Sequence, residues 1–271
     1  MELTFIDFFA GVGGMRRGLE LCGHRCVGFC EIDKYAVMSY TSMHLITEEQ
    51  RQYLATLDLK QRQKEILKEE YRNGEWYAND ICKLHAGDIP KADIWCFGSP
   101  CQSFSQAGSR TGLDGVSGLI GEIFRLLSET REKDRPRYLI SENVKGMLTS
   151  RKGFDFLRIL MEMDRGGYDV EWQLLNSKDF VPQNRERVFT IGHLRGTSTS
   201  KVFPIETAGR EDSLEIRQIG RLQSERNNPN QYRVYEPDGI APTLTDMQGG
   251  GREPHIIIDP KYRGIEGVRQ L

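Results

Sequence analysis

Long apolar runs, a basic leader and an excess of positive charge are all missing from this sequence of 271 residues. No apolar run is long enough to span a bilayer, and the N-terminal stretch MELTFIDFFAG carries acids inside its apolar run, unlike a signal peptide. Lys and Arg number 37 against 39 Asp and Glu, so any surface that binds nucleic acid must be local. We therefore expect a cytoplasmic protein with no membrane partner.

Metal-ligand patterns are missing as well. The five histidines form no H-x-x-x-H pair, and three of the six cysteines have the spacing CGHRCVGFC. Structural zinc sites take cysteine pairs two to four residues apart with a second pair elsewhere, so a metal site is disfavoured and we expect none. We expect instead that Cys26 and Cys30 lie on one face of a buried strand and that Cys22 ends the preceding helix.

Strand-like and helix-like patterns alternate along most of the chain. Short apolar runs such as LTFIDFF, RCVGFC, IWCF and YLIS predict buried strands, and segments such as GEIFRLLSETREK predict the helices between them. This alternation predicts an α/β fold, with a mainly parallel sheet and helices on both faces. Residues 46–74 are rich in charge and begin with a T-x-x-Q capping box, which predicts a helical insertion that is either solvated or a partner-binding surface.

A glycine-rich turn, FFAGVGGMRRG, follows the first predicted strand and opens a helix. Such a turn lets backbone approach a ligand, but the dinucleotide pattern G-x-G-x-x-G is not met because Arg16 stands at the third glycine position. Glu31 and Asp33 lie roughly 20 residues further on, where an acid can bind ribose hydroxyls. The pattern fits an adenosine-containing ligand, and it also fits an ordinary tight turn.

Polar residues mark the ends of further predicted strands. Cys101 in GSPCQSFSQAG follows the strand IWCF, Asp80 follows the insertion, and Glu142 in SENV comes just past the strand YLIS. A thiol and a carboxyl at adjacent strand ends form an active-site pairing, although a packing cysteine and a loop aspartate are the plain alternatives. Arg185 and Arg187 in QNRERVF can clamp an anion or form surface ion pairs.

Six motifs in this order, FIDFFAGVGGMRRGL, EID, NDI, GSPCQSFSQAG, SENVKGM and QNRERVF, resemble the motif series of the DNA (cytosine-5)-methyltransferases. The resemblance covers residues 4–194 and continues into GIAPTLTDMQGGG. It implies a Rossmann-like S-adenosylmethionine-dependent methyltransferase sheet in a catalytic and cofactor-binding domain, residues 1–194. It implies a small, irregular, partial target recognition domain in residues 195–271.

The resemblance implies that a cytosine is flipped out of double-stranded DNA and methylated at C5, as in restriction-modification systems. Cys101 matches the nucleophile that adds to C6, and Glu142 matches the carboxyl that holds the base at N3 and supplies a proton. Arg187 matches the residue near cytosine O2, and Arg185 a neighbouring DNA or loop contact. The implied protein is a monomer on DNA.

The implied cofactor is S-adenosylmethionine, with S-adenosylhomocysteine as its product. The residues that match its binding motifs are Phe9, Gly11, Gly13, Gly14, Glu31, Ile32, Asp80, Ile81, Pro100 and Leu119. The residues that match DNA contacts are Gln102, Ser103, Ser105, Gln183, Thr243, Gly249 and Gly250. The loop from Gln102 to Gly115 resembles the mobile loop that closes over DNA, and the arginines before Thr243 are expected at phosphates or guanines.

The chain departs from the family pattern in two places. SKDFVPQNRER lacks the glycine usually found before VPQ, and the chain ends at GVRQL without the Arg-Leu-rich helix and Gly-Asn-Ala/Ser-Val motifs that follow in relatives. We therefore expect a truncated methyltransferase, weakly active or inactive alone, which a C-terminal fragment could complement, with an uncovered apolar strip near Met15 and Leu19. The alternatives are an RNA cytosine-5 methyltransferase of the same family and a non-catalytic DNA-binding remnant.

Overall fold

The computed structural model describes residues 1–100, 116–181 and 183–206, and beyond them the backbone of four short strands. The chain divides into two compact units, Met1–Gln173 with Val188–Phe203, and Leu174–Arg187 with Pro204–Leu271. The predicted assignment of a catalytic domain to residues 1–194 and a recognition domain to residues 195–271 stays a prediction, since compactness alone assigns no role.

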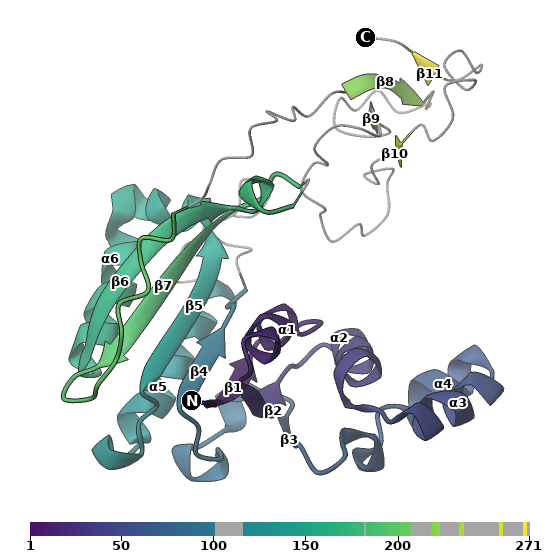
Figure 1. Cartoon of the computed structure of the whole chain (residues 1–271), viewed down its shortest axis with the longest axis horizontal. Coiled ribbons are helices and arrows are strands. Elements are labelled where there is room, and N and C mark those ends of the chain that lie inside the picture. Colours follow the sequence, from purple (N-terminus) through teal and green to yellow (C-terminus); the bar gives the residue numbers. More distant parts are fainter. Residues whose placement is uncertain are drawn as a thin grey trace. The chain divides into compact units, whose positions relative to one another are not determined.

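Seven strands form the main sheet, in the order β3-β2-β1-β4-β5-β7-β6 (Figure 1). They are β1 (Thr4–Phe8), β2 (Arg25–Cys30), β3 (Trp76–Ala78), β4 (Ile94–Phe97), β5 (Tyr138–Val144), β6 (Tyr168–Asn176) and β7 (Glu186–Leu194). Strands β1 to β5 pair in parallel. The end of β7 lies beside the starts of its neighbours β5 and β6. The N–H of Leu194 donates to the carbonyl of Arg137, just before β5, and the N–H of Arg195 donates to the carbonyl of Gly167, just before β6. Strand β7 therefore runs antiparallel to both. The predicted mainly parallel sheet is confirmed.

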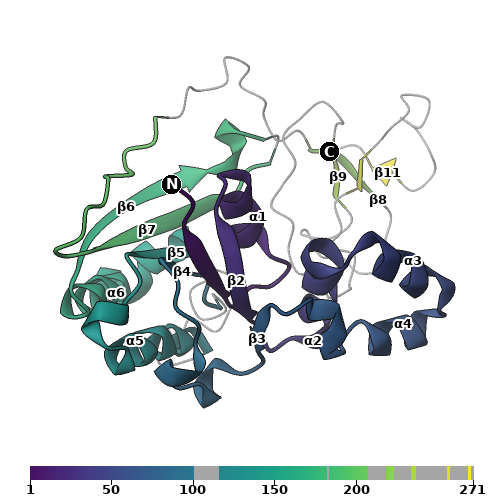
Figure 2. The ribbon, with the colours of Figure 1, turned by 60° about the horizontal axis from the view of Figure 1, so that its bottom comes forward.

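Helices cover both faces of this sheet (Figures 1 and 2). α1 (Gly14–Leu21) and α2 (Lys34–Tyr40) lie on one face, and α5 (Ile120–Glu129) and α6 (Phe154–Arg165) lie on the other. α5 buries Ile123, Leu126 and Leu127 against the sheet, the helical spacing of apolar residues that its sequence predicts. Each described helix is too short or too polar to cross a membrane, and the longest of them, α6, has 12 residues.

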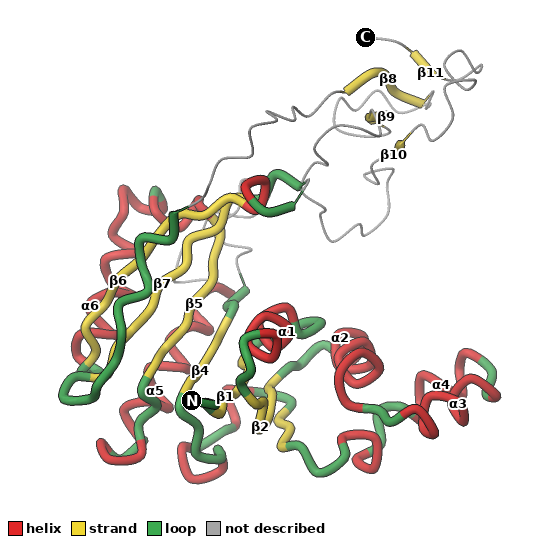
Figure 3. The backbone as a smooth tube through the Cα atoms, in the orientation of Figure 1, coloured by secondary structure: helices red, strands yellow, loops and turns green. Residues whose placement is uncertain are grey.

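The charge-rich segment after α2 forms two short helices, α3 (Glu48–Thr56) and α4 (Leu59–Glu65), and a 3₁₀ turn, Glu69–Arg72 (Figure 3). The predicted capping box is formed, because the Thr47 side chain accepts from the N–H of Gln50 while the Gln50 side chain accepts from the N–H of Thr47. Leu54, Ile66 and Tyr71 give these helices a small core of their own.

Strand β2 carries a β-bulge that its sequence pattern does not reveal. Phe5 pairs with Cys26, but the next residue, Ile6, pairs with Gly28. This one-residue shift reverses the facing of the later residues. Cys26 and Cys30 therefore face opposite sides of the sheet, and the expectation that they share a face is wrong. Cys22 does end α1, as expected.

The second unit contains a four-stranded sheet in the order β10-β9-β8-β11. Its strands are β8 (Gln218–Leu222), β9 (Arg233–Tyr235), β10 (His255–Ile256) and β11 (Val268–Arg269). β8 pairs antiparallel with both β9 and β11, and Arg221 is the register partner of both Arg233 and Arg269. Three arginine positions thus occupy one row across this sheet, in a region whose sequence shows no clear period.

Candidate active site

Five parallel strands bring their carboxyl ends to one edge of the main sheet, where open α/β sheets bind ligands. The predicted site residues at this edge are Phe9, Gly11, Gly13 and Gly14 after β1, Glu31 and Ile32 after β2, Asp80 and Ile81 after β3, Pro100 after β4, and Glu142 near the end of β5. Leu119 ends the 3₁₀ turn that leads into α5. Because β5 extends to Val144, Glu142 lies within the strand rather than past it.

The loop after β1 has an unusual backbone, because Phe9, Gly11 and Gly13 adopt φ angles of 54°, 55° and 85°. Glycine accepts this left-handed conformation, whereas Phe9 adopts it at a cost in strain. The N–H of Gly13 donates to Ala10 at 2.8 Å, which closes the loop. A Cβ on Gly11 would meet no described atom within 4 Å, so the loop backbone is open to an approaching ligand there.

The carboxylate of Glu31 links this loop to the end of β2. Oε2 accepts from the N–H of Gly11 at 2.8 Å, and Oε1 accepts from the N–H of Asp33 at 2.8 Å. A carboxylate has about four lone-pair positions, so each oxygen can still accept from a hydroxyl group. Beside it the Ile32 side chain is 64% exposed. An acceptor pair next to an exposed apolar side chain suits a ribose and the face of its base.

Asp80 and Ile81 lie where the chain leaves β3. Asp80 Oδ1 accepts from the N–H of Cys82 at 3.0 Å and so starts a 3₁₀ turn. The Ile81 side chain is only 4% exposed, so a ligand would meet its backbone rather than its side chain. Open backbone at Gly11, the acceptors of Glu31 and the exposed Ile32 together fit an adenosine-containing cofactor.

Strand β4 ends where Phe97 pairs with Ser141 of β5, so Gly98 and Glu142 are the next residues along the two chains. A Cβ on Gly98 would lie 3.4 Å from Oε2 of Glu142, so this carboxylate lies against the glycine backbone. One residue further, the side-chain amide of Asn143 donates to the Ser99 hydroxyl at 3.1 Å in a buried bond that joins the two strand ends. Cys101 comes two residues after Ser99 and lies outside the described residues.

Gln183 and Arg185 lie in the turn between β6 and β7, and Arg187 is the second residue of β7; all three belong to the second unit. Asn176 organises this turn, because its Oδ1 accepts from the backbone N–H of Arg185 at 3.1 Å. The guanidinium of Arg187 donates to the carbonyl of Glu186 at 2.7 Å. The predicted site residues that lie outside the described part of the chain are Cys101, Gln102, Ser103, Ser105, Thr243, Gly249 and Gly250.

Sequence reasoning missed Asp7, a carboxyl in the middle of β1 that is 1% exposed. Burial raises the pKa of Asp7 to about 8, against the opposing effects of a backbone hydrogen bond from Arg16 and of the Cys96 thiol. Its Oδ2 has no hydrogen-bond partner among the described residues. An acid inside the apolar run LTFIDFF is the signal that could have revealed it.

The buried cysteines of the sheet have the properties of packing residues. Burial raises the pKa of both Cys26 and Cys30 to about 12, so these thiols stay protonated near neutral pH. The described residues contain no group of three or more His, Cys, Asp or Glu side chains that could hold a metal ion. A buried thiol that stays protonated is a poor nucleophile, which fits a packing role for Cys26 and Cys30.

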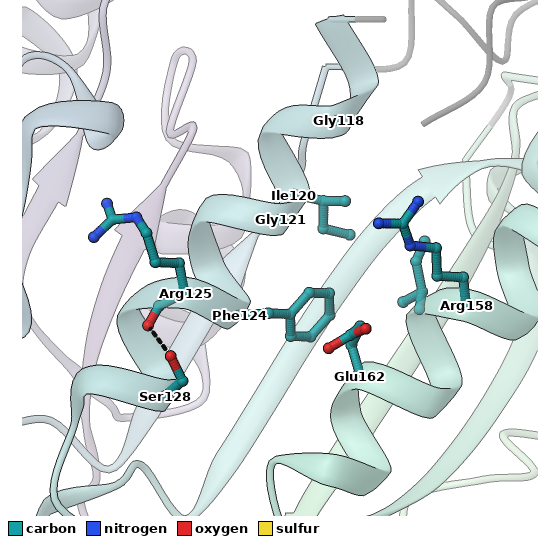
Figure 4. A pocket seen from close by; sticks show the side chains of 9 residues that line it. Gly118, Ile120, Gly121, Phe124, Arg125, Ser128, Arg158 and Glu162 are labelled. Carbon is teal, nitrogen blue, oxygen red and sulfur yellow. Dashed lines mark hydrogen bonds between the residues drawn. The ribbon is translucent and has the colours of Figure 1, made fainter. Parts of the chain in front are cut away.

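A separate cavity of about 420 Å³ lies between α5 and α6 (Figure 4). Its apolar lining comes from Ile120, Phe124 and Ile159, and Arg158 and Glu162 stand on its α6 side. None of the predicted site residues that the structure describes lines this cavity. It is distinct from the edge that carries Glu31 and Glu142.

The chain as a whole is similar to proteins of one family. The family model described as C-5 cytosine-specific DNA methylase matches residues 3–238. The chain is 34% identical over 220 residues to the type II methyltransferase M.DsaV of Dactylococcopsis salina, which covers 79% of this chain and 54% of that protein. It is 36% identical over 193 residues to the type II methyltransferase M.NlaX of Neisseria lactamica, with 70% of this chain and 51% of that protein covered. The chain thus spans about half the length of these curated relatives.

Solved structures resemble the chain in fold. The S. pombe Dnmt2 methyltransferase matches with a TM-score of 0.63 at 21% identity, covering 96% of this chain and 78% of that chain. The Entamoeba histolytica methyltransferase EhMeth matches with a TM-score of 0.54 at 16% identity, covering 79% of this chain and 58% of that chain. The predicted Rossmann-like methyltransferase fold is confirmed.

Proposed function

The chain belongs to the C-5 cytosine-specific DNA methylase family, and on that premise we propose that it methylates C5 of cytosine in double-stranded DNA, with S-adenosylmethionine as the methyl donor. One observation carries the proposal. Gly98, which comes three residues before Cys101 in the sequence, lies against the carboxylate of Glu142. A carboxyl in this position can hold the same base that a thiol in the following loop attacks.

The glycine loop and its acidic neighbours would hold the cofactor. Glu31 would accept from the ribose hydroxyls, Ile32 would pack on the adenine ring, and Asp80 would lie at the adenine edge. The remaining proposed contacts are Phe9, Gly11, Gly13, Gly14, Ile81, Pro100 and Leu119. When bound, S-adenosylmethionine supplies an electrophilic methyl group.

Cytosine C5 is a weak nucleophile, so the side chains must activate the ring. Cys101 is assigned as the nucleophile from its place in the sequence. Its thiolate would add to C6, and Glu142 would give a proton to N3 as electron density moves into the ring. C5 thereby becomes nucleophilic, and Arg187 would hold the O2 oxygen. After methylation, loss of the C5 proton and departure of the thiolate restore the double bond between C5 and C6, and N3 returns its proton to the Glu142 carboxylate, so both side chains are regenerated.

The second unit would bind the DNA backbone. Arg221, Arg233 and Arg269 occupy one register row across its sheet. Like charges at directly paired positions destabilise a sheet unless an anion neutralises them, and a DNA phosphate supplies that charge. The proposed DNA contacts at Gln183 and in the segments around Gln102 and Thr243 rest on the sequence.

Bisulfite sequencing of DNA from cells that express the chain tests this function. The wild type should protect specific cytosines from conversion, Cys101→Ala should protect none, and Glu142→Gln should slow methylation by about 10²-fold or more, the contribution of a positioned proton donor. Cys22→Ala, which removes an exposed thiol elsewhere, should behave as wild type.

Three outcomes would overturn the proposal. Methylation that survives in Cys101→Ala would remove the assigned nucleophile. Methylation of RNA in the absence of DNA methylation would favour the RNA alternative, whereas DNA binding with no methylation of either would favour a non-catalytic remnant.

A further inference from the structure

The helical insertion, residues 46–74, is attached at both ends to the elements that form the cofactor loop. His44 stands just before it and contacts loop residue Val12, and Glu75 stands just after it and pairs with Arg16 of α1. We propose that His44 and Glu75 are positioning residues for the cofactor loop, so that the insertion supports the cofactor site. This inference rests on the proposed function.

His44 reaches the loop because the chain leaves α2 through a π turn, Thr41–Leu45. The N–H of Ile46 donates to the carbonyl of Thr41 at 3.2 Å, an i to i+5 bond that widens the turn by one residue. The Nε2 atom of His44 then lies 2.9 Å from the carbonyl oxygen of Val12. A carbonyl oxygen only accepts, so Nε2 carries a proton and donates it.

The imidazole fits against the loop because Gly13 has no side chain. A Cβ on Gly13 would lie 2.4 Å from Nε2 of His44 and 3.0 Å from the ring of Tyr40. The Val12 carbonyl and the Gly13 N–H belong to the same peptide group. His44 binds the carbonyl and Ala10 accepts from the N–H, so both polar groups of this peptide are fixed. The plane of this peptide sets the course of the loop into α1.

Glu75 acts on the helix that follows the loop. Arg16, in the first turn of α1, is 6% exposed, and its Nη1 donates to Glu75 at 2.6 Å and to the Tyr40 hydroxyl at 3.1 Å. A guanidinium this deeply buried requires charged partners, and removing one is costly. Glu75 therefore helps to fix the first turn of α1 and, with it, the end of the cofactor loop.

The two ends of the insertion are joined, so His44 and Glu75 act together. The side-chain amide of Asn73 donates to the carbonyl of Leu45 at 2.7 Å and to the side chain of Gln50 at 3.0 Å. Met38 of α2 packs against the insertion's own apolar core. A shift of this segment would therefore move both contacts with the cofactor loop and α1.

Calorimetry with S-adenosylhomocysteine tests the inference on the purified full chain. His44→Leu removes the donor at similar volume and should raise Kd roughly five- to tenfold, the range expected for one hydrogen bond. His44→Asn keeps an N–H donor and should recover part of that loss. His24→Leu is the matched control, because His24 also makes one hydrogen bond with backbone, to the N–H of Leu3, but at the opposite edge of the sheet.

A second measurement separates positioning from general stability. In steady-state kinetics, Glu75→Gln, which keeps a hydrogen-bonding side chain, should raise KM for the cofactor about threefold or more while KM for DNA and kcat stay near wild type. If His44→Leu fails to fold, this variant decides the question alone. Wild-type Kd in His44→Leu, or equal changes in both KM values in Glu75→Gln, would overturn the inference while leaving the proposed function intact. A wild-type chain that neither binds the cofactor nor methylates DNA would overturn both.

Discussion

Two turns at the carboxyl edge of the sheet have the same left-handed backbone but are held in different ways. Both lead into a helix, the first into α1 and the second into α6. The left-handed residues are Phe9, Gly11 and Gly13 in the first turn and Arg151, Lys152 and Gly153 in the second, with φ angles from 46° to 92°. The first turn uses glycine at two of its three left-handed positions, whereas the second uses glycine at one.

The contacts that hold the two turns also differ. Side chains from distant elements fix the first turn, Glu31 from the end of β2 and His44 from the π turn. In the second turn the N–H of Lys152 donates to Thr149, and Asp155 accepts from the hydroxyl of Ser150, all within a few residues. Non-glycine residues in this conformation cost about 1–2 kcal/mol each. Replacing a glycine by alanine should therefore destabilise the first turn, whereas replacing a non-glycine residue by glycine should stabilise the second.

Gly13→Ala should have the largest effect. The new Cβ would lie 2.4 Å from His44 in a residue with a φ of 85°, so both a clash and strain act, and we expect a loss of about 3 kcal/mol in the free energy of unfolding. Urea unfolding measures it. In the double variant, His44→Ala should restore the part of this free energy that is lost to the clash, and the part lost to backbone strain should remain. A Gly13→Ala protein as stable as wild type would contradict the close packing described here.

Gly11→Ala should destabilise less. Its φ of 55° makes alanine unfavourable, but a Cβ there would meet no described atom within 4 Å, so only the strain of about 1–2 kcal/mol remains. Gly18→Ala is the matched control within α1, where the same change should stabilise by about 0.5–1 kcal/mol. Equal unfolding free energies for these two variants would show that the left-handed conformation has no cost in the first turn.

Lys152→Gly should change stability in the opposite direction. Lys152 is exposed and has a φ of 61°, so glycine at this position relieves backbone strain. Glycine also has the larger conformational entropy in the unfolded chain, which offsets part of this gain. The net increase in the free energy of unfolding should be about 0.5–1 kcal/mol. Urea unfolding again provides the measurement, with Lys133→Gly, in the short turn before β5, as a control that should not stabilise. A destabilised Lys152→Gly would mean that the lysine side chain, rather than the backbone, maintains the turn.

The sequence predicts the carboxyl edge well because local signals mark it. Glu31, Asp80 and Glu142 each stand at or near the end of a short apolar run, and parallel strands necessarily bring such ends together. The mainly parallel sheet follows from the same alternation of strands and helices. The roles of these residues remain proposals, since geometry at one edge does not by itself assign a reaction.

The features that the sequence does not predict depend on contacts between distant segments. The bulge that separates Cys26 from Cys30 has no local signature, because it is defined by the partner strand. His44 follows an ordinary helical segment, and only the tertiary structure brings it to Val12. Arg16 is visible as a break in the glycine pattern, but its burial against Glu75 depends on residues 59 positions away.

The comparison of the two turns extends to the aspartates buried near them. Asp155 accepts from the Ser150 hydroxyl, and its Oδ1 lies 4.0 Å from Nε of Arg151. Asp7 has the Cys96 thiol 3.7 Å from one oxygen and no hydrogen-bond partner among the described residues at the other. The Asp7 carboxylate is therefore poorly compensated, and burial raises its pKa to about 8. Polar side chains of the second turn compensate the buried carboxylate of Asp155, whereas Asp7 avoids a buried charge by staying protonated.

Asp7→Asn should alter how stability depends on pH more than stability itself. With a pKa of about 8 when folded and 3.8 as its ordinary value, Asp7 keeps a proton in the folded chain that the unfolded chain releases between these pH values. Its contribution to stability is therefore fully present below about pH 4 and is lost as the pH rises to about 8. Asparagine cannot titrate, so the variant should lose less stability than wild type between pH 5 and pH 8, as urea unfolding at several pH values would show. Parallel pH profiles for the two proteins would mean that Asp7 is already ionised in the folded chain, and that the Arg16 backbone and Cys96 compensate its charge.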